Sequence, residues 1–334
     1  MNILLTGGMG YIGSHTVVSL AEAGHSVHIY DNLCNSNSQV LSRIKQITPK
    51  NIGFTEGDVR DTAMLTNVLK NQGINAVIHL AGLKAVGESS QKPIEYYANN
   101  VQGSISLIEA MQKNDIKTLV FSSSATVYGD PLYLPYDEGH PTSPTNPYGR
   151  NKLQVEEMLR DLSASDKEWR IACLRYFNSV GAHKSGLIGE DPNGIPNNLM
   201  PVIGQVVNGK LSVLNVFGDD YETHDGTGKR DYIHVMDLAE GHLAALNWLM
   251  NNPGCHTFNL GSGISYSVLD LLHRFEHVSG QKIPYQVVAR RPGDLPEYFA
   301  KANKAKEMLH WETKRGLTEI CDSSWLWIKN CKIH

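Results

Sequence analysis

Tyr148 and Lys152 are the residues whose types and spacing first suggest chemistry, because they stand four positions apart. On a helix this spacing places both side chains on one face. A tyrosine is a poor base at neutral pH, since its free pKa is about 10. Bringing that pKa to about 7 requires roughly 4 kcal/mol, which one lysine and a bound cationic cofactor ring can supply together. The pair predicts a general base, although an ordinary surface helix can carry the same spacing.

A helix is expected to hold this pair. Asn146 and Pro147 supply a capping residue and a proline at the first helical position. Apolar residues then recur at helical spacing, at Leu153, Val155, Met158, Leu159 and Leu162. We therefore predict a helix over residues 148–163.

A second motif, TGGMGYIG at residues 6–13, fits the glycine patterns GxGxxG and TGxxGxxG. A strand is predicted before it over residues 2–6, a helix over 11–23, and a second strand over 26–30. In this setting the glycines let the backbone approach a pyrophosphate, which the helix N-terminus attracts. The pattern predicts a dinucleotide site, and a tight turn without a ligand is the alternative.

Asp31 follows the second predicted strand. A carboxylate at this point accepts hydrogen bonds from the adenosine ribose and repels a 2'-phosphate. NAD is therefore favoured over NADP.

Further strands are predicted over 52–56, 76–80, 118–122 and 170–177, and a helix containing Asn99 and Asn100 is predicted over 95–113. Strands that alternate with helices indicate an α/β fold with a doubly wound parallel sheet, whose ligands bind at the carboxyl ends of the strands. Asp58 lies at such an end, where it is expected to meet the adenine. We predict a Rossmann-type NAD-binding domain over residues 1–180.

Clean alternation is lost after residue 180, where glycine, proline and asparagine increase. We predict a smaller mixed α/β substrate lobe over residues 181–334. It contains polar groups suited to a charged ligand: Asn198, Arg230, Arg291 and Asp294. Guanidinium groups bind diphosphates with two parallel hydrogen bonds, although any single arginine is more often a solvated surface residue.

Composition narrows the class of protein. The net charge of -4 gives no sign of a nucleic-acid-binding patch or of attraction to an anionic membrane surface. The five cysteines are scattered and odd in number, which indicates reduced thiols in a cytoplasmic protein. The histidines show no metal-binding spacing, and we expect neither a signal peptide nor a membrane-spanning segment.

These motifs resemble those of the extended short-chain dehydrogenase/reductases, which combine TGGxGYIG, YxxxK and a serine about two dozen residues before the tyrosine, here Ser124. Longer segments are similar to the family of UDP-glucose 4-epimerases, namely AGLKAVGES, FSSSATVYGD, LRYFN, VGAH, GEDPNGIPNNLMP, DGTGKRDYIHVMDLA, FNLGSG and GDLPEY. They run from residue 1 to beyond residue 300. The resemblance implies a cytoplasmic homodimer of galactose metabolism that holds NAD tightly and pairs through helices over 95–113 and 148–163.

The resemblance also implies a mechanism that interconverts UDP-glucose and UDP-galactose. Tyr148 as phenolate takes the proton of the 4-hydroxyl while C4 passes hydride to NAD. Lys152 lowers the pKa of the tyrosine and binds the nicotinamide ribose, and Ser124 hydrogen-bonds the 4-oxygen and relays the proton. The flat 4-keto sugar then turns in the pocket, and hydride returns to its other face.

The residues expected to bind the cofactor are Gly7, Gly10, Tyr11, Ile12, Gly13, Asp31, Asn32, Asn35, Ser36, Asp58, Val59, Leu80, Ala81, Gly82, Lys84, Asn99, Ser122, Tyr148, Lys152, Tyr176 and Phe177. The residues expected to bind the UDP-sugar are Lys84, Ser124, Thr126, Tyr148, Asn178, Asn198, Leu199, Asn215, Phe217, Arg230, Arg291, Asp294 and Tyr298. The chain departs from the family pattern at Ser179, where proline is expected, and at Lys229.

Three alternatives remain open from the sequence. A nucleotide-sugar 4,6-dehydratase would carry Asp-Glu after the serine, where this chain has Ala125 and Thr126. A non-catalytic NAD-sensing protein would not need Ser124, Tyr148 and Lys152 together. A UDP-GlcNAc/UDP-GalNAc 4-epimerase would need a small residue where this chain has Tyr298, whose ring is expected to fill the volume beside C2 of the sugar.

Overall fold

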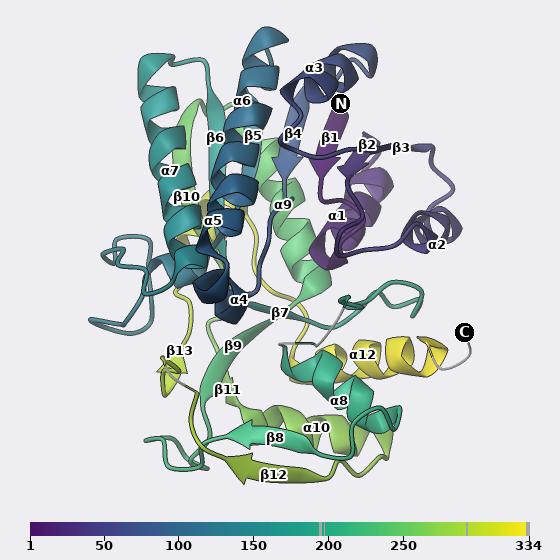
Figure 1. Cartoon of the computed structure of the whole chain (residues 1–334), viewed down its shortest axis with the longest axis vertical. Helices are drawn as coiled ribbons and strands as arrows, with labels where there is room; N and C mark the ends of the chain where they lie inside the picture. Colours follow the sequence, from purple (N-terminus) through teal and green to yellow (C-terminus); the bar gives the residue numbers. More distant parts are fainter. Residues whose placement is uncertain (194–195, 197, 292, 332–334) are drawn as a thin grey trace.

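The computed structural model describes residues 1–193, 196, 198–291 and 293–331. Its centre is a parallel sheet with the strand order β10-β6-β5-β4-β1-β2-β3 (Figure 1). The strands of this sheet are β1 (Asn2–Thr6), β2 (Ser26–Asp31), β3 (Ile52–Glu56), β4 (Ala76–His79), β5 (Thr118–Ser124), β6 (Arg170–Tyr176) and β10 (Gly254–Leu260). The order reverses between β1 and β4, so a crevice is expected at the carboxyl ends of these two strands.

Helices cover both faces of the sheet because the strands are apolar on both sides. Along β1, Ile3 and Leu5 pack on one face and Leu4 on the other. One face is covered by α1 (Tyr11–Glu22), α2 (Gln39–Ile47), α9 (Val235–Leu249) and α11 (Asn303–Leu309). The other face is covered by α3 (Thr62–Asn71), α6 (Gly103–Lys113) and α7 (Pro147–Ser165). The predicted doubly wound α/β fold is confirmed.

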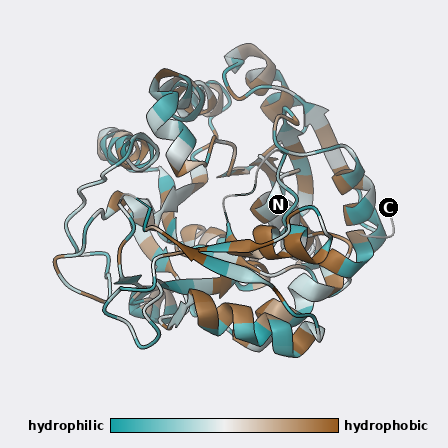
Figure 2. Ribbon diagram, turned by 60° about the horizontal axis from the view of Figure 1, so that its bottom comes forward, coloured by the Kyte–Doolittle hydropathy of each residue, from teal (hydrophilic) through white to brown (hydrophobic). Residues whose placement is uncertain are grey.

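A smaller lobe lies beyond the carboxyl edge of the large sheet (Figure 1). Its strands are β7 (Asn178–Val180), β8 (Leu214–Phe217), β9 (Lys229–His234), β11 (Ser265–Ser267), β12 (Tyr285–Val288) and β13 (Glu297–Tyr298), and its helices are α8 (Leu199–Val207), α10 (Val268–Ser279) and α12 (Leu317–Cys331). Its core is separate from the two cores of the large sheet. Helix α10 buries Leu271, Leu272 and Phe275 on one side, and Figure 2 shows hydrophobic and hydrophilic residues mixed along many of the helices.

The large sheet continues past the predicted domain boundary at residue 180. Strand β10 pairs with β6 at the edge of the sheet, and α9 packs against α1. The chain therefore returns to the first domain after it has begun the second lobe. The division at residue 180 stays a proposal. Helix α9 and strand β10 come after this residue in the sequence but pack with the first domain.

Helix α7 begins as predicted. Asn146 Oδ1 accepts a hydrogen bond of 2.9 Å from the Gly149 N–H, and Pro147 occupies the first turn. This cap fixes where the helix starts and hence which face carries Tyr148 and Lys152.

The single helix predicted over residues 95–113 is divided in the structure. A short α4 (Val86–Gln91) and α5 (Pro93–Tyr96) precede a π-helical turn over Tyr97–Gln102, and α6 follows. A single π-helical turn inside a helix is too short to change the apolar periodicity of a window of about 11–18 residues, so periodicity does not reveal it. Among the described residues, no helix is both long and apolar enough to cross a membrane.

Candidate active site

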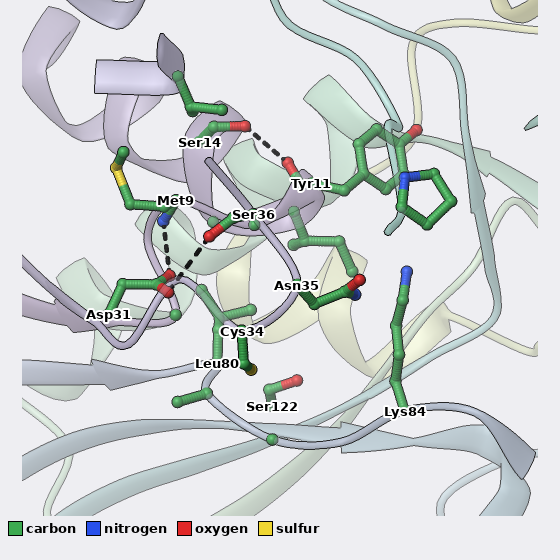
Figure 3. A pocket seen from close by; sticks show the side chains of 18 of the residues that line it. Met9, Tyr11, Ser14, Asp31, Cys34, Asn35, Ser36, Leu80, Lys84 and Ser122 are labelled. Carbon is green, nitrogen blue, oxygen red and sulfur yellow. Dashed lines mark hydrogen bonds between the residues drawn. The ribbon is translucent and has the colours of Figure 1, made fainter. Parts of the chain in front are cut away.

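A cavity opens at the carboxyl ends of the parallel strands, between the two lobes (Figure 3). Every residue expected to bind the cofactor lines it, except Asp58 and Phe177. Lys84 points its ammonium group into this space, opposite the turn that carries Tyr11 (Figure 3). The structure thus brings together residues that lie as far apart in the sequence as Gly7 and Tyr176.

The glycine turn packs too closely for side chains. Gly7 has a φ of +71°, and a Cβ added there would lie 2.7 Å from the Ala81 amide nitrogen. A Cβ at Gly13 would lie 2.1 Å from the Gly7 carbonyl oxygen. These contacts bring the first turn of α1 against the ends of β1 and β4, so its free backbone N–H groups face the cavity.

Asp31 holds this turn in place. Its carboxylate accepts hydrogen bonds from the Met9 N–H at 2.9 Å, the Leu33 N–H at 2.8 Å and the Ser36 hydroxyl at 3.3 Å (Figure 3). Burial raises the pKa of this carboxyl group. The structure places Asp31 in the lining of the cavity, and its contact with a ribose stays a prediction.

Asp58 lies beside the cavity, whose wall is formed here by its neighbours Gly57 and Val59. Its carboxylate receives two hydrogen bonds from the Arg60 guanidinium, at 2.8 and 2.6 Å. These bonds lower the pKa of Asp58 to about 2. A contact between Asp58 and an adenine therefore stays a prediction.

Tyr148 and Lys152 lie on successive turns of α7, as their spacing predicted. Lys152 is 6% exposed, and its Nζ donates a hydrogen bond of 2.6 Å to the Ser122 carbonyl. The ammonium also lies over the Phe121 ring, at 5.0 Å from the centroid, and 5.8 Å from the Tyr148 centroid. The carbonyl at the end of β5 thus holds the lysine beside the tyrosine.

Ser124 ends β5 and bonds the Tyr148 side chain. Its Oγ accepts hydrogen bonds from the Thr126 N–H at 3.2 Å and the Thr126 hydroxyl at 2.9 Å. Both bonds end on the serine oxygen, so the serine proton stays available for donation.

Burial dominates the electrostatics of Tyr148 and Lys152 in the protein alone. Burial raises the pKa of Tyr148 to about 12, and a hydrogen bond with Ser124 offsets only part of this rise. Burial also lowers the pKa of Lys152 to about 8, against the attraction of Glu156. A phenolate at neutral pH therefore requires more positive charge than Lys152 supplies.

Glu156 is a fully buried carboxylate one turn beyond Lys152. It accepts hydrogen bonds from Arg175 at 2.9 and 2.6 Å and from Arg160 at 2.9 Å. The Ser123 hydroxyl also donates a hydrogen bond to Glu156, and Ser123 lies on β5, the strand that carries Ser124. This network anchors α7 to β5 and β6 and thereby fixes the distance between Ser124 and Tyr148.

A second group of expected ligand residues is contiguous in the smaller lobe. The Tyr298 hydroxyl donates to Asn178 Oδ1 at 2.6 Å, and the Arg230 guanidinium lies 4.8 Å from the centre of the Tyr298 ring. Asp294 lies between two arginines, 3.5 Å from Arg230 and 2.9 Å from Arg291. We refer to these five residues as the arginine cluster.

Among the remaining candidates, Phe217 contacts the arginine cluster. The Arg291 guanidinium lies 4.7 Å from the centre of the Phe217 ring, and Asn215 accepts a hydrogen bond from Gln286. Lys84 and Asn198 both donate to one oxygen of Glu190, at 3.1 and 2.7 Å. Leu199 begins α8 directly after Asn198.

Some lining residues were missed by sequence reasoning. Val40, Arg43, Asp191, Pro192 and Trp327 also face the cavity, so the second lobe and α12 contribute to its wall. The Arg43 guanidinium lies over the Trp327 ring at 5.4 Å. No local motif indicates this contact, because the two residues meet only when α2 and α12 come together.

One surface group in the described part of the chain has metal-ligand character. His224, Asp225 and Asp270 lie close together in the small lobe. Both carboxylates already have local partners, since Asp270 caps α10 and Asp225 accepts from Thr227. None of the three lines the cavity.

Three fully buried histidines predict how stability depends on pH. The pKa of His15 and of His242 is lowered to about 4, and that of His79 to about 3, chiefly by burial. Since the unfolded chain has histidine pKa values near 6.5, it binds more protons than the folded chain below that pH. The free energy of unfolding should fall as the pH drops from about 6.5 to 4, by up to about 2 kcal/mol per histidine at pH 5.

Urea unfolding at pH 7 and pH 5 measures this fall. His224 is exposed, so His224→Gln should leave the difference between the two pH values unchanged. Equal unfolding free energies at pH 7 and pH 5 would contradict the prediction.

Comparison with known proteins identifies the family of this chain. The model of the NAD dependent epimerase/dehydratase family matches residues 3–261. The chain is 55% identical to the UDP-glucose 4-epimerase of Bacillus subtilis, over 98% of this chain and 96% of that protein. It is 54% identical to the UDP-glucose 4-epimerase of Mus musculus, with the same coverage.

Solved structures agree with this result. A UDP-glucose-4-epimerase from Stenotrophomonas maltophila, with bound NAD and formylated UDP-arabinopyranose, is 48% identical with a TM-score of 0.98, and the match covers 100% of this chain and 99% of that one. A UDP-glucose 4-epimerase from Bifidobacterium longum, in complex with NAD+ and UDP, is 47% identical with a TM-score of 0.95, over 99% and 98% of the two chains. The chain belongs to the NAD dependent epimerase/dehydratase family, in the branch of the UDP-glucose 4-epimerases.

Proposed function

We propose that this chain interconverts UDP-glucose and UDP-galactose by oxidising C4 of the sugar, turning the 4-keto sugar and reducing it on its other face. The observation that carries the proposal is the position of Tyr148, Lys152 and Ser124. Tyr148 and Lys152 line the cavity with the glycine turn, and Ala125, next to Ser124, packs in one apolar cluster with Phe177 and with Tyr298 of the arginine cluster. This arrangement supports a base that acts beside a cofactor site and a diphosphate site.

The residues of the cavity fit NAD. The glycine turn leaves no room for side chains and directs the N-terminus of α1 at the cavity, which suits a pyrophosphate. Asp31 supplies a buried carboxylate that suits a ribose diol and opposes a 2'-phosphate. NAD, when bound, supplies the acceptor and donor of hydride and adds the positive charge that the Tyr148 phenolate requires.

Each residue of the catalytic group then has a defined task. Tyr148 as phenolate accepts the proton of the 4-hydroxyl. Lys152, held by the Ser122 carbonyl, keeps a positive charge beside the phenolate. Both bonds from Thr126 end on the Ser124 oxygen, so the one serine proton can be donated to Tyr148 or, with substrate bound, to the 4-oxygen.

The arginine cluster supports firm binding of UDP with loose contact to the sugar. Arg230 and Arg291 present two guanidinium groups, and the shared Asp294 holds them in place. Diphosphates accept paired hydrogen bonds from such groups. The sugar can then rotate about its diphosphate bonds while the nucleotide stays fixed.

The dehydratase alternative is not supported by the site. Elimination of water across C5 and C6 requires an acid and a base after Ser124. Ala125 is apolar, and the Thr126 hydroxyl is bonded to Ser124. Neither residue can supply this chemistry, so we favour epimerisation.

We also propose a cytoplasmic homodimer. The two helices of the expected subunit contact, α6 and α7, stand together on one outer face of the large sheet (Figure 1). Ile94, in α5 ahead of the π-helical turn and α6 in the sequence, is 79% exposed. Light scattering of the purified protein gives the mass that tests this assembly.

We expect NAD to copurify with the protein and activity to need no added cofactor or oxidant. The reason is that the reaction regenerates its oxidant in every cycle, so a cofactor that never needs to leave can be held tightly. The check is enzymatic measurement of NAD in denatured protein, alongside conversion of UDP-galactose. Cofactor-free protein that turns over only with added NADP would contradict both this prediction and the role of Asp31.

One assay separates the functions considered. The protein is mixed with UDP-galactose, and the nucleotide sugars are separated by chromatography. UDP-glucose identifies the epimerase, and a 4-keto-6-deoxy product identifies a dehydratase. Unchanged UDP-galactose, with NAD bound, identifies a sensing protein and overturns the proposal.

A further inference from the structure

His79 is a buried histidine that neither the sequence motifs nor the proposed mechanism uses. It ends β4, is 3% exposed, and lies behind the wall of the cavity. Its Nδ1 is 2.7 Å from the Thr6 hydroxyl, and its Nε2 is 3.0 Å from the Ser104 hydroxyl. The ring therefore bridges the start of the glycine turn and helix α6.

The directions of these hydrogen bonds follow from their neighbours. The Ser104 hydroxyl donates its one proton to the Asn100 carbonyl, at 2.6 Å, so it accepts from His79 Nε2–H. The buried ring is neutral, so Nδ1 carries no proton and accepts from the Thr6 hydroxyl. The Thr6 oxygen in turn accepts from the Ala81 N–H at 3.3 Å. The tautomer of His79 with its proton on Nε2 therefore satisfies all of these hydrogen-bonding groups.

This chain of bonds ends on backbone that lines the cofactor cavity. Ala81 lines the cavity directly. Asn100 clamps Leu83, another lining residue, because its Oδ1 accepts from the Leu83 N–H at 2.8 Å and its Nδ2 donates to the Leu83 carbonyl at 3.0 Å. His79 thus joins the glycine turn to the loop of residues 80–84.

The same loop passes close to Lys152. A Cβ added at Gly82 would lie 3.1 Å from Asn100 Oδ1 and 3.9 Å from Lys152 Nζ. The His79 ring itself lies 5.9 Å from the Phe121 ring, whose face the Lys152 ammonium covers. A charged ring at position 79 would repel Lys152, and both burial and Lys152 keep the pKa of His79 low, at about 3.

We infer that His79 is a positioning residue for the cofactor, which sets the spacing between the glycine turn and the loop of residues 80–84 through Thr6 on one side and Ser104 and Asn100 on the other. The inference rests on the proposed NAD-dependent function. It predicts that the two bonds of the ring control how tightly NAD is held. None of Thr6, His79 and Ser104 is expected to contact the sugar, so the KM for UDP-galactose should not change.

The test uses the NAD-loaded protein and replaces the two hydroxyl residues that bond His79. These substitutions change less volume than a substitution of the histidine itself. Thr6→Val removes the donor to Nδ1, and Ser104→Ala removes the acceptor of Nε2–H. Ser104→Ala leaves only His79 Nε2–H unpaired and should release NAD about tenfold faster than wild type, and Thr6→Val should release it at least as fast, because it leaves both His79 Nδ1 and the Ala81 N–H unpaired. Release is followed by capturing free NAD with an excess of a second dehydrogenase.

Two variants serve as matched controls. Thr6→Ser keeps the hydroxyl and should restore slow release of NAD. Ser106→Ala removes another buried hydroxyl from the same helix, at 2% exposure, and should leave release unchanged. In the double variant of Thr6 and Ser104 the effects should be less than additive, because both act through one ring.

The outcomes separate this inference from the proposed function. Absence of UDP-galactose conversion by the wild type contradicts the proposed function, whatever the release rates. If the wild type converts UDP-galactose, the inference is overturned by NAD release from Thr6→Val and Ser104→Ala at the wild-type rate. It is also overturned if Ser106→Ala accelerates release as much, since the effect would then be a general loss of packing. Ser104→Ala, which unpairs the His79 ring without touching the Ala81 bond, decides the question if the other variants fail to fold.

Discussion

Replacing Tyr148 by phenylalanine should lower the turnover of UDP-galactose by roughly 10²–10⁴-fold, the contribution of a positioned general base. The substitution removes one hydroxyl, which bonds Ser124, and keeps the ring beside Lys152. The fold and the bound NAD should therefore be retained. The measurement is kcat for UDP-galactose, together with the NAD content and the thermal midpoint of the same preparation.

Tyr136→Phe is the matched control for this prediction. The Tyr136 ring is also buried, and its hydroxyl bonds the Gly129 carbonyl at 2.7 Å. Losing this hydroxyl costs about 1 kcal/mol of stability and should leave kcat near the wild-type value. Near-normal turnover in Tyr148→Phe would remove Tyr148 from the mechanism and favour a different base.

The pH dependence of kcat shows whether bound NAD supplies the positive charge that lowers the pKa of Tyr148. The chain's own groups leave the pKa of Tyr148 at about 12, because burial outweighs the Ser124 hydrogen bond. If bound NAD supplies the missing positive charge, the holoenzyme should show a rise in kcat at a pH far below 12. The sequence alone could not give this balance, since it depends on how deeply α7 is buried.

The sequence predicted the parts of the fold that local pattern controls. Apolar runs located the strands of the large sheet, and the Asn146 cap located the start of α7. The π-helical turn before α6 was missed, because one turn is too short to stand out in the apolar periodicity of a long helix. The return of α9 and β10 to the first sheet was also missed, since strand order depends on contacts between distant segments.

The same distinction applies to the site. The glycine turn and the Tyr148–Lys152 spacing are local, and both are where the sequence predicted them. The Arg43–Trp327 contact and the Tyr298–Asn178 bond join residues far apart in the chain, so no spacing indicates them. The position of Asp58 was predicted, but its pairing with Arg60, two residues away, was not considered.

Tyr298 offers the second large effect, on the choice of sugar. By resemblance this position lies beside C2, and the structure packs its ring between Phe177, at 6.1 Å between ring centres, and the Arg230 guanidinium. A ring held on both sides cannot move aside for an acetamido group. An overlap of a few kcal/mol lowers a rate by about a hundredfold. The chain should use UDP-glucose and UDP-galactose efficiently and UDP-GlcNAc poorly.

Tyr298→Cys should raise kcat/KM for UDP-GlcNAc by about a hundredfold, because it removes the ring that occupies the space. It should also lower kcat/KM for UDP-galactose by about tenfold, because Asn178 loses its hydroxyl donor and Arg230 loses the ring beneath it. NAD content should stay unchanged, since Tyr298 does not line the cofactor cavity.

Tyr298→Phe separates the two causes. It keeps the ring and removes only the hydroxyl bond to Asn178, so it should reproduce the loss with UDP-galactose without any gain with UDP-GlcNAc. The comparison of kcat/KM for both sugars in wild type and the two variants decides the matter. If the wild type already converts UDP-GlcNAc well, the ring is no barrier, and the alternative activity on N-acetylated sugars becomes the better description of the site.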